Sequence, residues 1–246
     1  SVNSGTIGDL ITNTATLTDI NGVDGISANN TSSVDVQVYD PGAPSSCVEP
    51  PLFSFTNPIL EQGSALQVNS VYRFSNVGGG IDALVKIKSI NNATISDLDA
   101  DNSANNAANF SPLFKITQNG GYIEWEIKLV QTGTTAPVKK NFAMTALDID
   151  GYAPNGSQSI RDYLGFSQNQ SNTVQAGNKI DESTSGAFQY FTSNTNTDGL
   201  GSFDINHMAY ISYRYTSVFV FRTGSNSTGG YYIDRLVDLD FTQCRN

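Results

Sequence analysis

The chain has little of the chemistry that most enzymes and nucleic-acid-binding proteins need. Its 246 residues include one His and two Cys, and Lys and Arg number 13 against 23 Asp and Glu, a net charge of −10. A nucleic acid requires a basic surface, which this balance excludes. No G-x-S-x-G or H-E-x-x-H motif accompanies the lone His207, so the sequence predicts a packed or surface histidine and no enzyme.

Long hydrophobic runs are also absent. The sequence has no stretch of about 18 apolar residues and no charged-then-apolar segment at its start, so we expect neither membrane insertion nor a signal peptide within it. We interpret the chain as part of a longer secreted polypeptide at the extracellular cell surface. The acidity suits divalent cations, although it also keeps a secreted protein in solution.

Helical periodicity is missing too, and strand alternation takes its place. In "GYIEWEIKLV", Tyr122 and Glu124 alternate with Ile123 and Trp125, as in a strand buried on one face. Similar segments recur at 70–74, 83–90, 114–116, 140–146, 188–192, 207–214, 218–223 and 231–241. We therefore predict an all-β fold, a β-sandwich of the jelly-roll or Ig-like type.

Three long polar stretches separate these strands, at residues 96–111, 152–185 and 193–206. They exceed the usual length of plain connections, and functional residues concentrate in long loops. We expect these stretches to be loops that carry the function.

Two modules are expected along the chain. Residues 1–40 contain the alternating segments "DLITNTATLTDI" and "TSSVDVQVYD", which we interpret as the last strands of an Ig-like domain. Residues 41–51 are dense in Pro, Gly and Ser and are predicted to be a linker. Residues 52–246 then form the main β-sandwich.

The two cysteines lie near the two ends of the second module. Cys47 and Cys244 flank it, and the termini of a β-sandwich often lie close together, so a disulfide is predicted. The alternative is two unrelated thiols. A zinc site is disfavoured because two Cys and one His do not make the usual four-ligand set.

One acidic cluster, "SDLDADNSANN", has the spacing of half a calcium loop. Asp97, Asp99 and Asp101 alternate with other residues, which places their carboxylates within reach of one hard cation. Ala108 stands where an EF-hand has its closing Glu, so the loop is not an EF-hand. A solvated acidic turn is the alternative.

A second acidic cluster follows a strongly apolar strand in "TALDIDGYAPNG". Asp148 and Asp150 project to one side at the strand end, and the Gly that follows allows a turn, so calcium binding is expected here. Asp82 and Asp162 are candidates to complete a site, with turn caps as the alternative. Clustered carboxylates in polar loops favour ionised, metal-binding side chains over a glycosidase pair.

Longer segments resemble a known family. "VGGGIDALVKIKSINNATISDLDAD", "GYIEWEIKLVQTGTTAPVKKNFAMTALDIDG" and "VFVFRTGSNSTGGYYIDRLVDLDF" are similar to the calcium-dependent ligand-binding (peptide-binding) module of giant repeats-in-toxin surface adhesins of Gram-negative bacteria. The segments "ITNTATLT" and "SVDVQV" resemble the Ig-like extender repeats of large bacterial surface proteins.

The resemblance implies a cofactor, a ligand and a set of residues. Bound Ca²⁺ stiffens the loops and ligates a carboxylate of the ligand, commonly the free C-terminus of a target-cell protein. Asp148, Tyr152 and Asn155 are expected to contact that ligand. The implied metal ligands are Asp82, Asp99, Asp101, Asp148, Asp150 and Asp162.

Two classes of function remain open at this point. The first is a non-catalytic adhesin module that binds a peptide C-terminus, or a glycan in a lectin-like manner, with Tyr152, Tyr163 and Tyr190 as candidates for an exposed aromatic platform. The second is a structural spacer stiffened by calcium. Neighbouring extender domains of the same polypeptide are expected partners in both.

Overall fold

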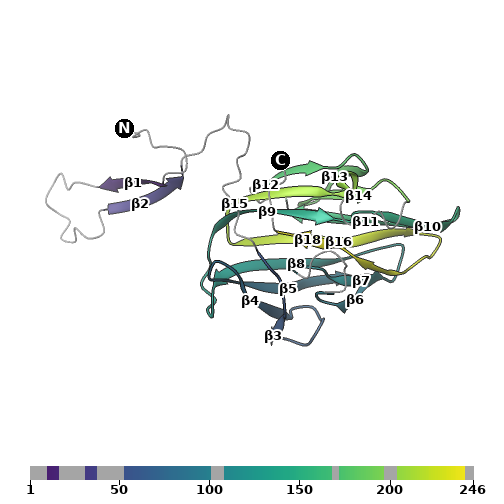
Figure 1. Ribbon diagram of the computed structural model, residues 1–246, viewed down its shortest axis with the longest axis horizontal. Helices are drawn as coiled ribbons and strands as arrows, with labels where there is room; N and C mark the ends of the chain where they lie inside the picture. Colours follow the sequence, from purple (N-terminus) through teal and green to yellow (C-terminus); the bar gives the residue numbers. More distant parts are fainter. Residues whose placement is uncertain are drawn as a thin grey trace. The chain divides into compact units, whose positions relative to one another are not determined.

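The computed structural model describes the backbone of residues 10–16, 31–37, 53–100, 108–167, 172–196 and 204–241, and the side chains of these ranges except 10–16, 31–37 and 172–176. The chain divides into two compact units, Ser1–Val48 and Glu49–Asn246 (Figure 1). The division falls inside the stretch predicted to be a linker. Each unit is described by itself.

The first unit contains a pair of antiparallel strands. β1 (Leu10–Thr16) pairs with β2 (Thr31–Gln37) in an unbroken register, from Leu10 opposite Gln37 to Thr16 opposite Thr31. Both strands lie in the segments whose alternation predicted them. The Ig-like character of residues 1–40 stays a prediction.

The second unit is an all-β sandwich built from three antiparallel sheets (Figure 1). The nine-stranded sheet contains, in order, β13 (Ile180–Ser185), β14 (Phe188–Ser193), β11 (Gln158–Ser167), β16 (Val218–Thr228), β8 (Gly120–Gln131), β5 (Ile81–Asn91), β4 (Val71–Gly78) and β3 (Ile59–Gln62), with β10 (Gly151–Asn155) paired to β11.

Two smaller sheets accompany it. The four-stranded sheet has the order β12 (Asn172–Ala176), β15 (Ala209–Thr216), β9 (Lys140–Leu147) and β18 (Asp238–Asp240). The three-stranded sheet has the order β17 (Asp234–Leu236), β7 (Leu113–Ile116) and β6 (Ala93–Asp97). A 3₁₀ turn, η2 (Ile205–His207), precedes β15.

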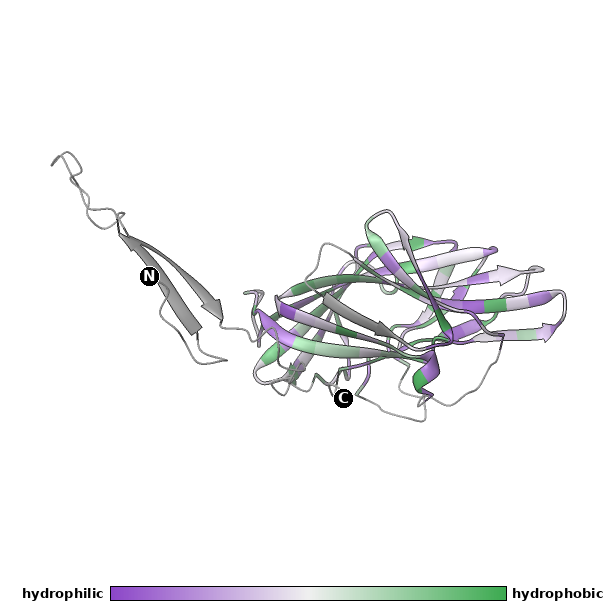
Figure 2. Cartoon of the chain, turned by 90° about the horizontal axis from the view of Figure 1, so that it is seen from above, coloured by the Kyte–Doolittle hydropathy of each residue, from purple (hydrophilic) through white to green (hydrophobic). Residues whose placement is uncertain are grey.

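The sheets enclose a core rich in aromatic rings. Phe142 and Tyr213 of the four-stranded sheet pack on Phe219 of the nine-stranded sheet, with ring centroids 5.1 and 5.2 Å apart. Phe110 meets Trp125 edge to face at 5.4 Å. Each such side chain contributes roughly 1.5–3 kcal/mol by leaving water. Figure 2 shows the alternation of hydrophobic and hydrophilic residues along the strands that produces this core.

The predicted strand alternation of β8 is confirmed. Ile123, Trp125 and Ile127 are fully buried, while Tyr122 and Glu124 are only half-buried. The turn at Thr216 and Ser217 also connects strands, but β15 and β16 belong to different sheets, so the chain crosses the sandwich there.

The prediction that residues 152–185 form a loop is wrong. This stretch contributes to β10 and contains β11, β12 and β13, and β11 lies between β14 and β16 in the nine-stranded sheet. The polar composition of the stretch predicted a loop, but among its described side chains a few apolar ones pack into the core: Ile160, Leu164, Phe166 and Ile180. Residues 231–241 were expected to be one strand and instead contain two, in different sheets. In the part of the chain that the structure describes, no helix is long and apolar enough to cross a membrane.

Candidate functional site

A buried ion cluster lies where β10, β11 and β17 meet. Arg235 of β17 donates to Asp162 of β11 through Nε at 2.8 Å and Nη2 at 2.6 Å, and its Nη2 also donates to Asp150. Ser225 Oγ donates to the other Asp162 oxygen at 2.7 Å. The backbone N–H of Asp162 donates to the Asp150 carbonyl at 2.9 Å, which holds the two acidic residues side by side.

Arg235 occupies the position between two carboxylates that the sequence interpretation gave to a metal ion. Asp150 and Asp162 are 1% and 0% exposed, and Arg235 is 7% exposed. Buried carboxylates require charge-assisted hydrogen bonds, which the guanidinium supplies to both. One feature of the sequence could have predicted the role of Arg235 as the partner of these carboxylates: it is the only basic residue in the acidic segment "YYIDRLVDLDF".

Asp148 lies beside this cluster, between β9 and β10. Its φ of +61° is in the left-handed region, which Asp tolerates better than most residues because its short side chain bonds locally. Its side chain is half-buried. The residue between the two acidic positions, Ile149, is anchored through its backbone: its N–H donates to the His207 carbonyl at 2.9 Å, and His207 Nδ1 lies 3.2 Å from its carbonyl oxygen. His207 is therefore a packed residue.

Asp99 lies in a second acidic cluster that shares one chain segment with the first. Its Oδ1 accepts from the backbone N–H of Ser111 at 3.0 Å, and the Ser111 hydroxyl donates to Asp238 at 2.5 Å. Asp238 pairs with Leu147, directly before Asp148. The segment 234–240 thus contributes Arg235 to the first cluster and Asp238 to the second. We call this region, defined by Asp99, Asp148, Asp150, Asp162, Arg235 and Asp238, the acidic end.

Asp82 is not part of the acidic end. Asp82 lies opposite Val130 of β8. Asp162 lies opposite Ser225 of β16, which in turn lies opposite Gly121 of β8. Val130 and Gly121 are nine residues apart in β8, a distance of about 30 Å along the strand. Asp82 therefore lies too far from Asp162 to share a cation with it.

Asp82 has its own partners. Arg73 Nη1 donates to it at 2.7 Å, and the backbone N–H groups of Asn76 and Gly133 donate at 2.7 and 2.9 Å. Burial opposes its ionisation, but these backbone and guanidinium donors together hold its pKa below the ordinary value. Its observed contacts join strand β4 to the loop after β8.

Three predicted site residues lie outside the described residues: Asp101, Cys47 and Cys244. The disulfide and the role of Asp101 stay predictions. Among the residues that are described, no three His, Cys, Asp or Glu side chains are grouped so that they could hold a metal ion.

The predicted ligand-contact residues lie along the β10–β11 hairpin. Tyr152 is half-buried, and its ring lies 5.7 Å from that of Tyr231. Asn155 is exposed at the hairpin turn, where its Oδ1 accepts from Ser157 N at 3.0 Å and its Nδ2 donates to Gln158 at 2.9 Å. Asn155 thus closes its own turn, and Tyr152 is the one that adjoins the acidic end.

The expected aromatic platform is only partly exposed. Tyr163 is buried, and its hydroxyl donates to the Gly121 carbonyl at 3.0 Å, so the prediction that it is exposed is wrong. Burial raises the pKa of this hydroxyl. Tyr190 is half-buried and accepts from Arg222 at 2.6 Å. Arg222 is itself stacked on the rings of Tyr122 and Phe188.

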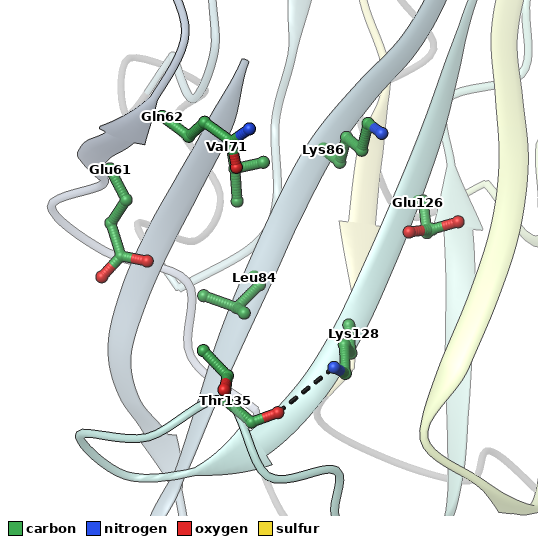
Figure 3. A pocket seen from close by; sticks show the side chains of 8 residues that line it. All are labelled: Glu61, Gln62, Val71, Leu84, Lys86, Glu126, Lys128 and Thr135. Carbon is green, nitrogen blue, oxygen red and sulfur yellow. Dashed lines mark hydrogen bonds between the residues drawn. The ribbon is translucent and has the colours of Figure 1, made fainter. Parts of the chain in front are cut away.

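A shallow pocket of 280 Å³ lies on the outer side of β3, β4, β5 and β8 (Figure 3). Lys86 and Lys128 line it together with Glu61 and Glu126, and Lys128 Nζ donates to the Thr135 carbonyl at 3.2 Å. It contains none of the predicted site residues. Because both acidic and basic side chains line the pocket, its charge does not indicate a particular class of ligand.

Comparisons with known proteins define the fold. No family model and no curated protein sequence matches the chain. The structure is similar to the N-terminal domain of the Streptococcus gordonii adhesin Sgo0707, with a TM-score of 0.51 and 12% identity over 80% of this chain and 64% of that one. It is also similar to the adhesin domain of PrgB from Enterococcus faecalis, with a TM-score of 0.43 and 9% identity over 77% and 65% of the two chains.

The first likeness places the chain in the class of β-sandwiches that includes an adhesin domain. Because the identity is low, it shows a shared fold. The chain spans less than two thirds of the length of the S. gordonii domain.

Proposed function

We propose that the chain is a non-catalytic, calcium-dependent ligand-binding module of a bacterial surface adhesin. The observation that carries this proposal is the convergence of Asp99, Asp150, Asp162 and Asp238, distant in sequence and all buried, on one end of a sandwich that shares its fold with an adhesin domain. Acidic residues are costly to bury and are retained where they organise loops or bind cations.

The proposed ligand is a peptide with a free C-terminal carboxylate. A calcium ion held near Asp148 keeps coordination positions that protein oxygens do not fill, and a ligand carboxylate enters one of them. Tyr152 adjoins Asp148 through Gly151 and the β10 strand and supplies an apolar surface for the last residue of the peptide. This arrangement provides specificity for a carboxylate without a basic pocket.

The test is capture of immobilised peptides by the purified chain. We expect peptides with a free C-terminus to bind in calcium, and their amidated forms or an excess of EDTA to weaken binding at least about tenfold, or 1.4 kcal/mol. Asp148→Asn should have the same effect, because Asn keeps the left-handed backbone and removes the charge. Asp181→Asn, at an exposed position of β13, is the matched control.

Equal binding of free and amidated peptides, or undiminished binding in EDTA, contradicts the proposal. A glycan array run in parallel tests the lectin-like alternative. Calcium-dependent stabilisation without capture of any ligand would favour the spacer.

A further inference from the structure

Asn109 differs from the other described buried side chains in that both of its polar atoms lack a partner. Its side chain is 2% exposed, and neither its Oδ1 nor its Nδ2 has a hydrogen-bond partner among the residues that the structure describes. A buried polar atom left unpaired costs about 1–3 kcal/mol, and the large majority of such atoms in folded proteins have partners. Two unpaired atoms on one buried amide therefore mark a position for a bound ion or an ordered water.

The backbone places this amide on the same face as the second acidic cluster. Phe110 and Leu239 exchange both of their backbone hydrogen bonds, at 3.1 and 3.0 Å, and their side chains point into the core. The residues on either side of an antiparallel pair project to the opposite face. Asn109 and Ser111 therefore share a face with Asp238, which lies opposite Ser111.

Two carboxylates meet on that face through one serine. Asp99 accepts from the Ser111 backbone at 3.0 Å and Asp238 from its hydroxyl at 2.5 Å, so oxygens of both acids lie within hydrogen-bond reach of one residue. Asp99 and Asp238 are 9% and 3% exposed. A second backbone bond, from Ala100 N to the Ser111 carbonyl at 2.8 Å, keeps Asp99 in place.

We propose that Asn109, Ser111, Asp99 and Asp238 form a binding site for a divalent cation of the calcium type. The four side chains offer two carboxylates, an amide oxygen and a hydroxyl, all hard oxygen donors, which Ca²⁺ combines with backbone carbonyls or water to reach six to eight ligands. The cation takes the Asn109 Oδ1, and a water in its shell accepts from Nδ2. Asp99 belongs to the set that the family resemblance implies, while Asn109, Ser111 and Asp238 are assigned from the structure alone.

The chemistry excludes two simpler occupants. A proton shared between the acids would neutralise one charge but leave both amide atoms of Asn109 unpaired. Zinc, copper and nickel prefer nitrogen or sulfur ligands, and this set has oxygen alone. The inference deepens the proposed function, because it gives the acidic end a cation site next to Leu147 and Asp148.

Asn109→Leu is the decisive variant because it replaces both unpaired amide atoms with apolar ones of similar volume. In EDTA its melting temperature should equal or exceed that of the natural chain, since no satisfied hydrogen bond is lost. In calcium at about 100 times the dissociation constant, the natural chain should gain roughly 5–10 °C. Asn109→Leu should lose most of this gain and bind at least tenfold more weakly in calorimetry.

Asp238→Asn should show the same loss of calcium binding. Asp234→Asn, an exposed acid four residues earlier, is its matched control and should keep the full response. The proposal is overturned if calcium binding is absent, or if Asn109→Leu responds to calcium as the control does. Should Asp238→Asn fail to fold, the Asn109→Leu result decides alone.

This test is independent of ligand capture. Failure to capture any peptide contradicts the proposed function and leaves the cation site standing. Unaltered calcium binding by Asn109→Leu removes the site whatever the peptide result.

Discussion

At the scale of single residues, the acidic end is stabilised by the Arg235 guanidinium, which donates hydrogen bonds to two carboxylates. Arg235 forms ion pairs with both Asp150 and Asp162, and all three side chains are buried. Removing one partner of a buried ion pair is strongly destabilising, because the remaining charge stays buried without that partner. The stability of this region should therefore depend on Arg235 far more than on any surface arginine.

We predict that Arg235→Met lowers the free energy of unfolding by about 3–5 kcal/mol at neutral pH in EDTA, because it leaves two buried carboxylates together. Adding Asp150→Asn should recover part of the loss, since one charge is then removed. Urea denaturation measures both. Lys115→Met, at an exposed position of β7, serves as control and should change stability by no more than about 0.5 kcal/mol. Normal stability of Arg235→Met would show that the cluster is not a structural centre.

At the scale of the strand, glycines in the nine-stranded sheet make room for tyrosine rings. Gly224 of β16 lies opposite Tyr163 of β11, and a Cβ on it would lie 2.4 Å from the Tyr163 ring and 2.5 Å from the Gly121 carbonyl oxygen. Gly165 is covered in the same way by Tyr190. The rings lie over the bare backbone, which lets Tyr163 reach the Gly121 carbonyl.

Gly224→Ala should accordingly destabilise the second unit by about 1–3 kcal/mol, the usual cost of overpacking, because both a ring and a backbone atom must move. Gly156→Ala is the matched control: nothing lies within 4 Å of its added Cβ, and its stability should be unchanged. Thermal unfolding of the two variants distinguishes them. Equal melting temperatures would mean that the sheet accommodates the extra methyl group without strain.

At the scale of the whole molecule, the chain is divided between two units of unequal size. The second unit has its own core, and the boundary falls after Val48. A unit with its own core needs nothing from its neighbour to fold.

Deleting residues 1–40 should leave the second unit folded, with a melting temperature within about 2 °C of its transition in the full chain. This deletion retains Cys47, so it does not disturb the predicted bond to Cys244. Circular dichroism and calorimetry give the result. If the shortened chain is unfolded, the first unit contributes to the core of the second, and the two-module interpretation fails.

The sequence by itself determined the all-β class, the positions of β5, β8, β9 and β16, and the acidic segments that form the acidic end. These features depend on neighbours along the chain, since side chains alternate between two faces with a period of two. Trp125 alternates with charged residues in the sequence and is fully buried in the structure for this reason.

Tertiary structure decided which acidic residues meet. Asp150 and Asp162 come together because β10 folds back on β11, and Arg235 reaches them from a strand that pairs with β7. Asp82 resembles them in its sequence setting but lies some nine residues away along the sheet. Strand register fixes these distances, and it is set by hydrogen bonds between segments far apart in the chain, which no local pattern records.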